Sequence, residues 1–239
     1  MNLLDVFTAL TYGELKQLKL GGFDADSLES APVPDSYAPL ISAINLGLTE
    51  LHKRFLLKTE EIYVQQYAHI EIYTLAWKYA ATNTASTEPY KYIVDTVAAP
   101  FQDNVLKIEE IYNEIGELLV LNDADDDESL FTPTYRSIQV PAPVSANVLG
   151  VQYRANHPKL VFARGMQPAN VEIELPEGLL EALLYYIAMR SFSSLNTDDN
   201  HESDNYLKKF EASCIQYKLS GLNLQPDLGN SNFDARGWP

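Results

Sequence analysis

The sequence predicts an α+β protein in which a helical bundle, built from the N- and C-terminal segments, carries an inserted antiparallel β-rich domain. Three observations predict it. Apolar residues recur at helical spacing in residues 37–55 and 176–222, they alternate with polar residues in between, and residues 223–239 have no period. We therefore expect a discontinuous helical domain (residues 1–58 and 176–222), a β-rich domain (59–175) and an extended C-terminal tail (223–239).

The N-terminal third predicts short helices followed by one long helix. Residues 3–20 suggest one or two short helices ended by Gly21 and Gly22, and residues 22–34 form a connection. Asp35 or Ser36 can then cap a helix. Its apolar positions give the clearest helical period in the chain: Tyr37, Leu40, Ile41, Ile44, Leu48, Leu51 and Phe55.

Residues 176–222 predict a helical hairpin. Pro176 suits a first helical turn, and a polar run over residues 193–200 separates two apolar stripes. The first stripe contains Leu180, Leu183, Leu184, Ile187 and Phe192, and the second contains Tyr206, Phe210, Cys214, Tyr217 and Gly221. Each helix is amphipathic and needs a partner surface, which the N-terminal third could supply.

The period between the helical segments is two. Ile62 and Val64 alternate with polar neighbours, Ile70 and Ile72 follow, and residues 75–81 could be strand or helix. A hairpin is expected around residues 106–121, and an acidic loop at 123–128 separates it from three strands near 137–140, 149–153 and 171–175. Such alternation indicates sheets with one buried face and hence antiparallel pairing.

Charge and composition limit the possible functions. The 33 acidic and 17 basic residues give a formal net charge of −16, which disfavours a protein that grips DNA or RNA but allows DNA to slide past. The single cysteine excludes an intrachain disulfide framework. Residues 1–10 contain Asp5 and lack the basic start of a secretory signal, and no apolar run is long enough to span a membrane. We expect a protein made in the cytoplasm.

No pattern in the sequence indicates catalysis, a metal or a cofactor. The acidic run 123–128 begins like an EF-hand loop, but Glu128 and Thr134 stand at its two diagnostic positions, so a solvated turn is favoured. The four histidines form no ligand pair, and phosphate-binding and nucleophile-elbow motifs are missing. Cys214 lies on an apolar stripe, which favours an inert thiol. We expect a protein that is not an enzyme.

The tail offers the candidate partner-binding residues Phe233, Arg236 and Trp238. Aromatic and arginine side chains are enriched at the energetic centres of protein interfaces. Two interpretations stay open at this point, a disordered end and a segment that docks into a partner.

The order of helix, β-rich insertion, helical hairpin and tail resembles the head-to-tail adaptor (connector) proteins of tailed bacteriophages. The segments that carry the resemblance are residues 48–55 leading into 59–65, 103–109 into 119–122, 137–141, 151–158, 175–183, 188–192 and 206–217. They span most of the chain, and they are a pattern of similar residues without a catalytic signature.

The resemblance implies a structural virion protein, made in the host cytoplasm, that forms a homo-oligomeric ring, usually of twelve copies. The helical bundle would form the ring wall, and the tail would grip the portal protein. The β-rich domain, which is larger than in minimal helical adaptors, would face the tail nozzle or fibre proteins, with DNA passing through transiently. Two alternatives stay open: a binding module whose β domain recognises a carbohydrate or protein, and a hydrolase with unrecognised carboxylates.

Overall fold

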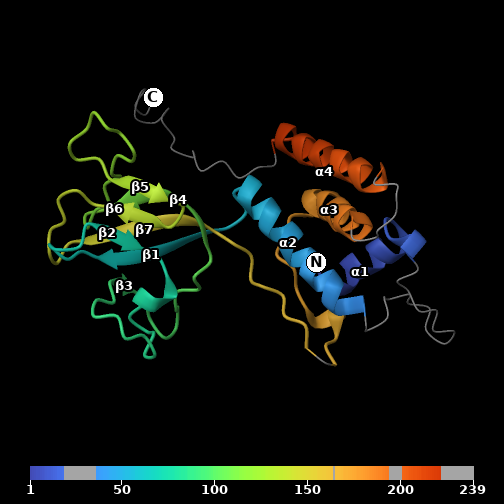
Figure 1. Cartoon of the computed structure of the whole chain (residues 1–239), viewed down its shortest axis with the longest axis horizontal. Coiled ribbons are helices and arrows are strands. Elements are labelled where there is room, and N and C mark those ends of the chain that lie inside the picture. Colours follow the sequence, from blue (N-terminus) through green and yellow to red (C-terminus); the bar gives the residue numbers. More distant parts are fainter. Residues whose placement is uncertain (19–35, 164, 194–200, 222–239) are drawn as a thin grey trace, which may run out of the picture. The chain divides into compact units, whose positions relative to one another are not determined.

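The computed structural model describes residues 1–18, 36–163, 165–193 and 201–221 (Figure 1). It confirms an α+β fold with antiparallel sheets. The chain divides into two compact units. The helical unit comprises Met1–Leu57 and Pro158–Pro239, and the β unit comprises Lys58–His157. Residues 158–175, which the sequence analysis placed with the strands, therefore group with the helices.

Helix α1 (Leu3–Tyr12) starts the helical unit with a reciprocal capping box. The Asn2 side chain accepts a hydrogen bond from the Asp5 backbone N–H, and the Asp5 carboxylate accepts one from the Asn2 N–H, both 2.9 Å long. This arrangement satisfies two amide groups that a helix start leaves unpaired. The helix buries Leu3, Val6, Phe7 and Leu10, and the short 3₁₀ turn η1 (Lys16–Leu18) follows it.

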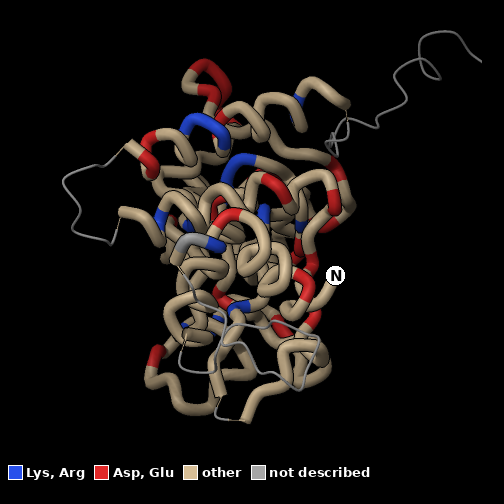
Figure 2. Tube along the Cα trace, turned by 90° about the vertical axis from the view of Figure 1, so that its right-hand side faces the viewer, with Lys and Arg blue, Asp and Glu red and all other residues tan. Residues whose placement is uncertain are grey.

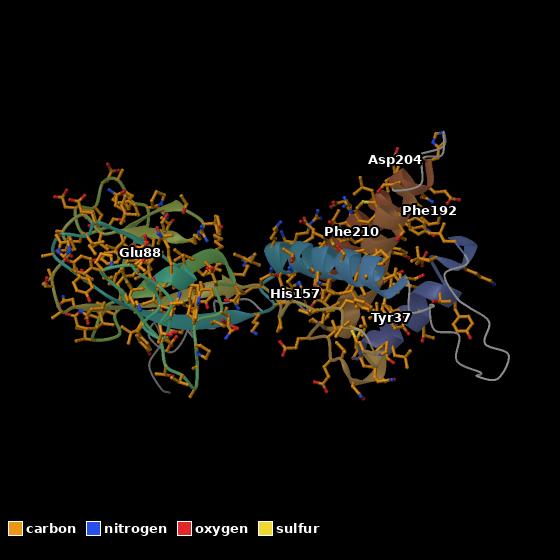
Figure 3. The ribbon with its side chains drawn as sticks, turned by 60° about the horizontal axis from the view of Figure 1, so that its bottom comes forward. Tyr37, Glu88, His157, Phe192, Asp204 and Phe210 are labelled. Carbon is orange, nitrogen blue, oxygen red and sulfur yellow. The ribbon has the colours of Figure 1, made fainter. Side chains whose placement is uncertain are left out.

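Helix α2 (Tyr37–Arg54) confirms the strongest periodicity in the sequence. Leu40, Ile41, Ile44, Leu48 and Leu51 are buried as expected. Ser36 holds the N-cap position, but its side chain makes no capping hydrogen bond, whereas Asp35 lies outside the described residues. Tyr37 packs on Phe7 of α1, with ring centroids 5.0 Å apart (Figure 3).

Helices α3 (Leu180–Ser193) and α4 (His201–Leu219) pack side by side as the predicted hairpin (Figure 1). Helix α3 is entered through the 3₁₀ turn η5 (Glu177–Leu179), for which Pro176 is the N-cap residue. Phe210 and Cys214 of α4 join Leu183 and Ile187 of α3 in one apolar core with α1 and α2. The polar run that separates the helices lies outside the described residues.

The predicted strand at residues 171–175 is wrong. Ile173 and Leu175 are buried as the alternation requires, but they belong to the helical core and not to a sheet. Only one isolated antiparallel bridge forms there, between Asn2 and Glu172, after the 3₁₀ turn η4 (Pro168–Asn170). An alternating pattern shows only that one face of a segment is buried. In this extended segment, the buried face packs against helices, and no sheet forms around it.

The β unit contains a four-stranded antiparallel sheet in the order β3-β1-β7-β4. The strands are β1 (Thr59–Gln65), β3 (Ile93–Val94), β4 (Val105–Tyr112) and β7 (Val148–Ala155). Four inward residues of the sheet have at most 5% of their surface exposed: Ile62, Val64, Ile111 and Val151. The predicted hairpin after β4 is reduced to a bridge between Tyr112 and Leu118 around Gly116, whose φ is +84°.

A three-stranded sheet in the order β2-β6-β5 shares the core of the β unit. Its strands are β2 (Ile72–Thr74), β5 (Phe131–Thr134) and β6 (Ser137–Gln139). The expected inward residue of β2 was wrong, because Ile72 is 54% exposed and its neighbour Tyr73 is fully buried. The ambiguous residues 75–81 contain the 3₁₀ turn η3 (Trp77–Tyr79).

Candidate functional site

The three residues predicted to bind a partner, Phe233, Arg236 and Trp238, lie outside the described residues. The described surfaces that could take part in assembly or binding lie on α4 and on the sheets of the β unit.

Helix α4 exposes three apolar side chains. Leu207, Ile215 and Leu219 are 42%, 58% and 81% exposed. The same helix buries Phe210, Cys214 and Tyr217 in the core. A helix with apolar residues both inside and outside offers a surface for another protein.

Helix α4 is attached to α2 by an ion pair with two hydrogen bonds between Arg54 and Glu211. Arg54 donates from both terminal nitrogens to the Glu211 carboxylate, over 2.7 and 2.8 Å, and from Nε to Glu50 over 3.0 Å. Its guanidinium also lies 4.7 Å from the ring centre of Phe210, which Figure 3 labels on α4. The hydrogen bond from Arg54 lowers the pKa of the Glu211 carboxyl. These contacts orient α4, so Arg54 has a structural role.

Cys214 is a buried thiol. Burial raises its pKa to about 11, which keeps it in the unreactive thiol form at neutral pH. No group of three or more metal-ligating side chains occurs in the part of the chain that the structure describes. In the acidic loop, the side chains of Asp123 and Asp126 accept hydrogen bonds from the backbone N–H groups of Asp125 and Glu128, so they shape the turn.

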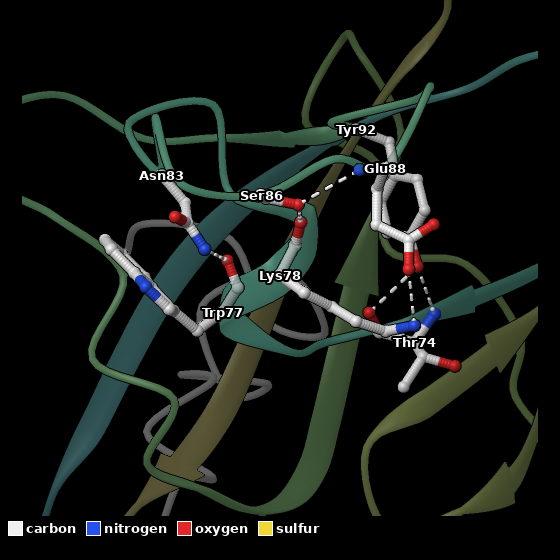
Figure 4. A network of polar contacts seen from close by, with 7 residues as sticks. All are labelled: Thr74, Trp77, Lys78, Asn83, Ser86, Glu88 and Tyr92. Atoms are coloured by element: carbon white, nitrogen blue, oxygen red, sulfur yellow. Dashed lines mark hydrogen bonds and ion pairs between the residues drawn. The ribbon is translucent and has the colours of Figure 1, made fainter.

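A polar network holds the loop between β2 and β3 (Figure 4). Lys78 pairs with Glu88 at 2.7 Å, and Ser86 donates to the Lys78 carbonyl oxygen. Asn83 donates to the Trp77 carbonyl oxygen over 3.0 Å. Each of these bonds joins two parts of the same loop, which indicates that the network stabilises the loop.

A buried polar group occurs where β1 meets β7. The Tyr153 hydroxyl lies 2.9 Å from a Glu60 carboxylate oxygen and 3.1 Å from the Asn104 amide oxygen, and Lys58 pairs with Glu60 at 3.1 Å. Burial alone would raise the pKa of Glu60, but the hydrogen bonds from Tyr153, Asn104 and Lys58 outweigh it and lower the pKa. Glu60 is therefore held as a carboxylate.

Asp95 is held in the same ionised state. It accepts hydrogen bonds from the Thr82 and Phe101 backbone N–H groups and from the Thr82 hydroxyl. Although burial opposes them, these bonds lower the pKa of Asp95. A general acid at neutral pH needs a shift in the opposite direction.

Two depressions lie beside Tyr63 of β1. One, of about 510 Å³, is lined by residues of β1 and of the 94–102 loop together with Tyr153. The other, of about 460 Å³, lies over the outer face of β1, β7 and β4. Its lining residues are Glu61, Tyr63, Tyr112, Asn113, Glu114, Gly116, Gly150 and Gln152. The sequence analysis singled out none of these residues, because only the strand register brings them together.

Comparison with known proteins gives no relative from which to infer a role. No protein-family model matches the sequence, and no curated protein is significantly similar to it. Across residues 1–18, 36–163, 165–193 and 201–221, no helix combines the length and apolar character needed to cross a membrane.

Proposed function

We propose that this chain is a head-to-tail adaptor of a tailed bacteriophage, a structural virion subunit that joins the capsid portal to the tail. The observation that carries the proposal is the insertion of a β unit, Lys58–His157, into a helical unit assembled from both ends of the chain. This organisation is the one that the resemblance in the sequence implies. Twelve copies in a ring would continue the DNA channel.

The helical unit has surfaces suited to a ring wall. The α3–α4 hairpin is fixed to α2 by the buried core and by the Arg54–Glu211 pair, while Leu207, Ile215 and Leu219 of α4 remain available for contact. Exposed apolar residues on a rigid helix favour association with a neighbouring subunit. We assign these three exposed side chains of α4 to the contact between subunits.

The charge of the chain supports passage of DNA without binding. Acidic positions are spread along the traced chain and do not gather on one element (Figure 2). With a net charge of −16, the subunit repels phosphate groups. A channel built from such subunits would let DNA slide, whereas a basic channel would hold it.

The C-terminal tail is assigned to the portal. Phe233, Arg236 and Trp238 would anchor it, and their burial would offset the entropy that the tail loses when it becomes ordered. The β unit would meet tail nozzle or fibre proteins. The proposed activity is mechanical and needs no cofactor or metal.

Cryo-electron microscopy of the native particle tests the proposal. The expected result is a ring of this chain between portal and tail, with residues 223–239 against the portal. Absence of the chain from such a ring would overturn the adaptor assignment and favour a separate binding module.

A tail variant tests the portal contact separately. Replacing Phe233, Arg236 and Trp238 together with alanine should abolish attachment to portal rings while thermal unfolding stays unchanged. The matched control replaces Asn230, Ser231 and Asn232 with alanine and should attach normally. Undiminished attachment of the first variant would refute docking through these side chains.

A further inference from the structure

The outer face of the four-stranded sheet carries two ordered rows of side chains. Strand β7 pairs with β1 and β4, and the register places Glu61 and Glu110 on either side of Gln152. One pair further along, Tyr63 and Tyr112 flank Gly150 in the same way. Because side chains two residues apart share a face, an acidic row lies beside an aromatic row.

Gly150, which is buried, lies between the two tyrosines of the aromatic row. A Cβ atom at this position would lie 3.7 Å from Tyr63 Cε1, 3.7 Å from Tyr112 Cβ and 3.4 Å from Glu61 Oε1. The Tyr63 ring, the Tyr112 Cβ atom and one carboxylate oxygen therefore surround a residue that has no side chain. The 460 Å³ depression lies over this point, and Tyr63 is 50% exposed beside it.

The negative charge of this slot has no cation facing it. Glu61 and Glu114 line the depression, and its lining contains no lysine or arginine. The nearest basic side chains along the strands, Lys107 and Arg154, occupy the next row and both pair with Glu109, over 2.6 and 2.7 Å.

The tyrosine hydroxyl groups interact with the carboxylates of the acidic row. Hydrogen bonds to Glu61 and to Glu110 raise the pKa values of Tyr63 and Tyr112, respectively. The charge of Glu61 also raises the pKa of Tyr112, so both tyrosine hydroxyls lie in the field of the same carboxylate.

We propose that the slot formed by Glu61, Tyr63, Tyr112, Gly150 and Gln152 binds the guanidinium group of an arginine presented by a protein partner. A guanidinium is planar, stacks on a tyrosine ring and donates two parallel hydrogen bonds to a carboxylate. It brings five donors and no acceptor, which complements a lining rich in acceptors.

The Asn113 side chain, which also lines the slot, already makes hydrogen bonds within its own turn. The Asn113 side-chain amide donates to Glu117, and its oxygen accepts from the backbone N–H groups of Ile115 and Glu117. A saccharide would also stack on the tyrosines, but its hydroxyl groups bring as many acceptors as donors. The excess of carboxylates therefore favours a cation.

A titration of the full chain followed by ¹⁵N NMR tests this assignment. The probe is N-acetyl-arginine methylamide, and the matched neutral probe is the corresponding citrulline derivative. We expect saturable shifts at the amides of Gly150 and Gln152 with the arginine probe, weakened by added salt, and no saturable shifts with the citrulline probe. Glu61→Gln should weaken binding about tenfold, because a charge-assisted bond becomes a neutral one.

Three variants separate binding at this site from a general effect of charge. Glu71→Gln, which removes an exposed carboxylate of the same unit outside the slot, should bind like the unaltered chain. Tyr63→Phe should retain binding because the ring remains, whereas Tyr63→Leu should lose it. Circular dichroism establishes that each variant is folded.

The proposal is overturned if citrulline binds as well as arginine, if a methyl glycoside binds while arginine does not, or if Glu61→Gln leaves affinity unchanged. Absence of any saturable shift would also overturn it. The titration requires neither ring nor portal, so its outcome is independent of the adaptor assignment.

Discussion

The hydroxyl group of Tyr92 forms both backbone hydrogen bonds that a neighbouring strand would give to Thr74. It accepts from the Thr74 N–H over 2.8 Å and donates to the Thr74 carbonyl oxygen over 2.9 Å (Figure 4). The Tyr73 hydroxyl likewise accepts a hydrogen bond from the Tyr67 backbone N–H over 2.8 Å and donates one to the Tyr67 carbonyl oxygen over 3.1 Å. Tyrosines thus satisfy backbone groups where strands of the β unit are short or end.

Removing the Tyr92 hydroxyl should therefore destabilise the β unit. Tyr92 is 3% exposed, so Tyr92→Phe leaves a donor and an acceptor of Thr74 without this partner. We expect the free energy of unfolding in urea to fall by about 1–3 kcal/mol. Tyr135→Phe, at a residue that is 57% exposed, is the control and should change little. Equal effects of the two substitutions would contradict the role given to the Tyr92 hydroxyl.

Gly47 should resist a substitution that usually stabilises helices. Alanine is favoured over glycine in a helix by about 1 kcal/mol. A Cβ at Gly47, however, would lie 2.7 Å from Leu183 Cδ1 and 3.0 Å from Tyr186 Cδ1, and Leu183 is fully buried. We expect Gly47→Ala to lower the melting temperature, because overpacking costs about 1–3 kcal/mol. A higher melting temperature would show that α3 can move away from α2 without loss.

The Arg54–Glu211 pair should contribute modestly and depend on geometry. The two side chains are 31% and 45% exposed, so solvent screens their attraction. Arg54→Ala should lower the free energy of unfolding by about 1 kcal/mol, and Arg54→Lys should recover only part of it because lysine cannot bond the carboxylate with two prongs. Lys53→Ala, at a 57% exposed side chain, serves as the control in the same urea titration. Full recovery by lysine would show that charge alone matters.

Glu60 should make the protein sensitive to acid. Its folded-state pKa lies below the ordinary value of 4.5, so its stabilising effect is present above pH 4.5 and is lost as the pH falls through the folded-state pKa. In Glu60→Gln, the free energy of unfolding should depend less on pH below 4.5. Denaturant titrations at a series of pH values test this, and an unchanged pH dependence would contradict it.

Cys214 should be protected in the folded protein and should contribute to loss of stability in alkali. Burial raises its pKa from 9.0 to about 11, so its effect on stability is complete below pH 9 and is lost as the pH rises from about 9 to about 11. A disulfide reagent at pH 8 should label the native protein slowly and the urea-unfolded protein rapidly. Rapid labelling of the native protein would show that the thiol is accessible. The free energy of unfolding of the Cys214→Ala variant should depend less on pH between 9 and 11.

Helical periodicity predicted the helices well because burial of one face fixes a period that the sequence displays directly. Leu40, Ile44 and Leu48 of α2 are buried as their spacing predicts. The same logic found β1 and β7 but was wrong for residues 171–175, where alternation reflects burial against helices. Strand β3 has only two residues and β5 contains Pro133, so neither gives a period long enough to recognise.

The candidate slot was beyond prediction for a different reason. Tyr63, Tyr112 and Gly150 become neighbours only through the pairing of β7 with β1 and β4. A shift of one residue in either register would place the tyrosines on the other face. Long-range pairing sets this register, and a bulge between Ile108 and Glu110 modifies it. A local sequence pattern shows neither the long-range pairing nor the bulge. The predicted tail residues lie outside the described residues, so that hypothesis awaits its own experiment.

The insertion of the β unit also sets an order of events during synthesis. Helix α2 leaves the ribosome long before α3, against which it buries Gly47 and its apolar stripe. At about 5–20 residues per second, translation of the intervening β unit takes on the order of 5–20 s. The β unit begins and ends on paired neighbours, since Thr59 lies opposite Arg154. The β unit can therefore fold while α1 and α2 still lack their packing partners. The core of the helical unit forms only after α3 and α4 have been synthesised.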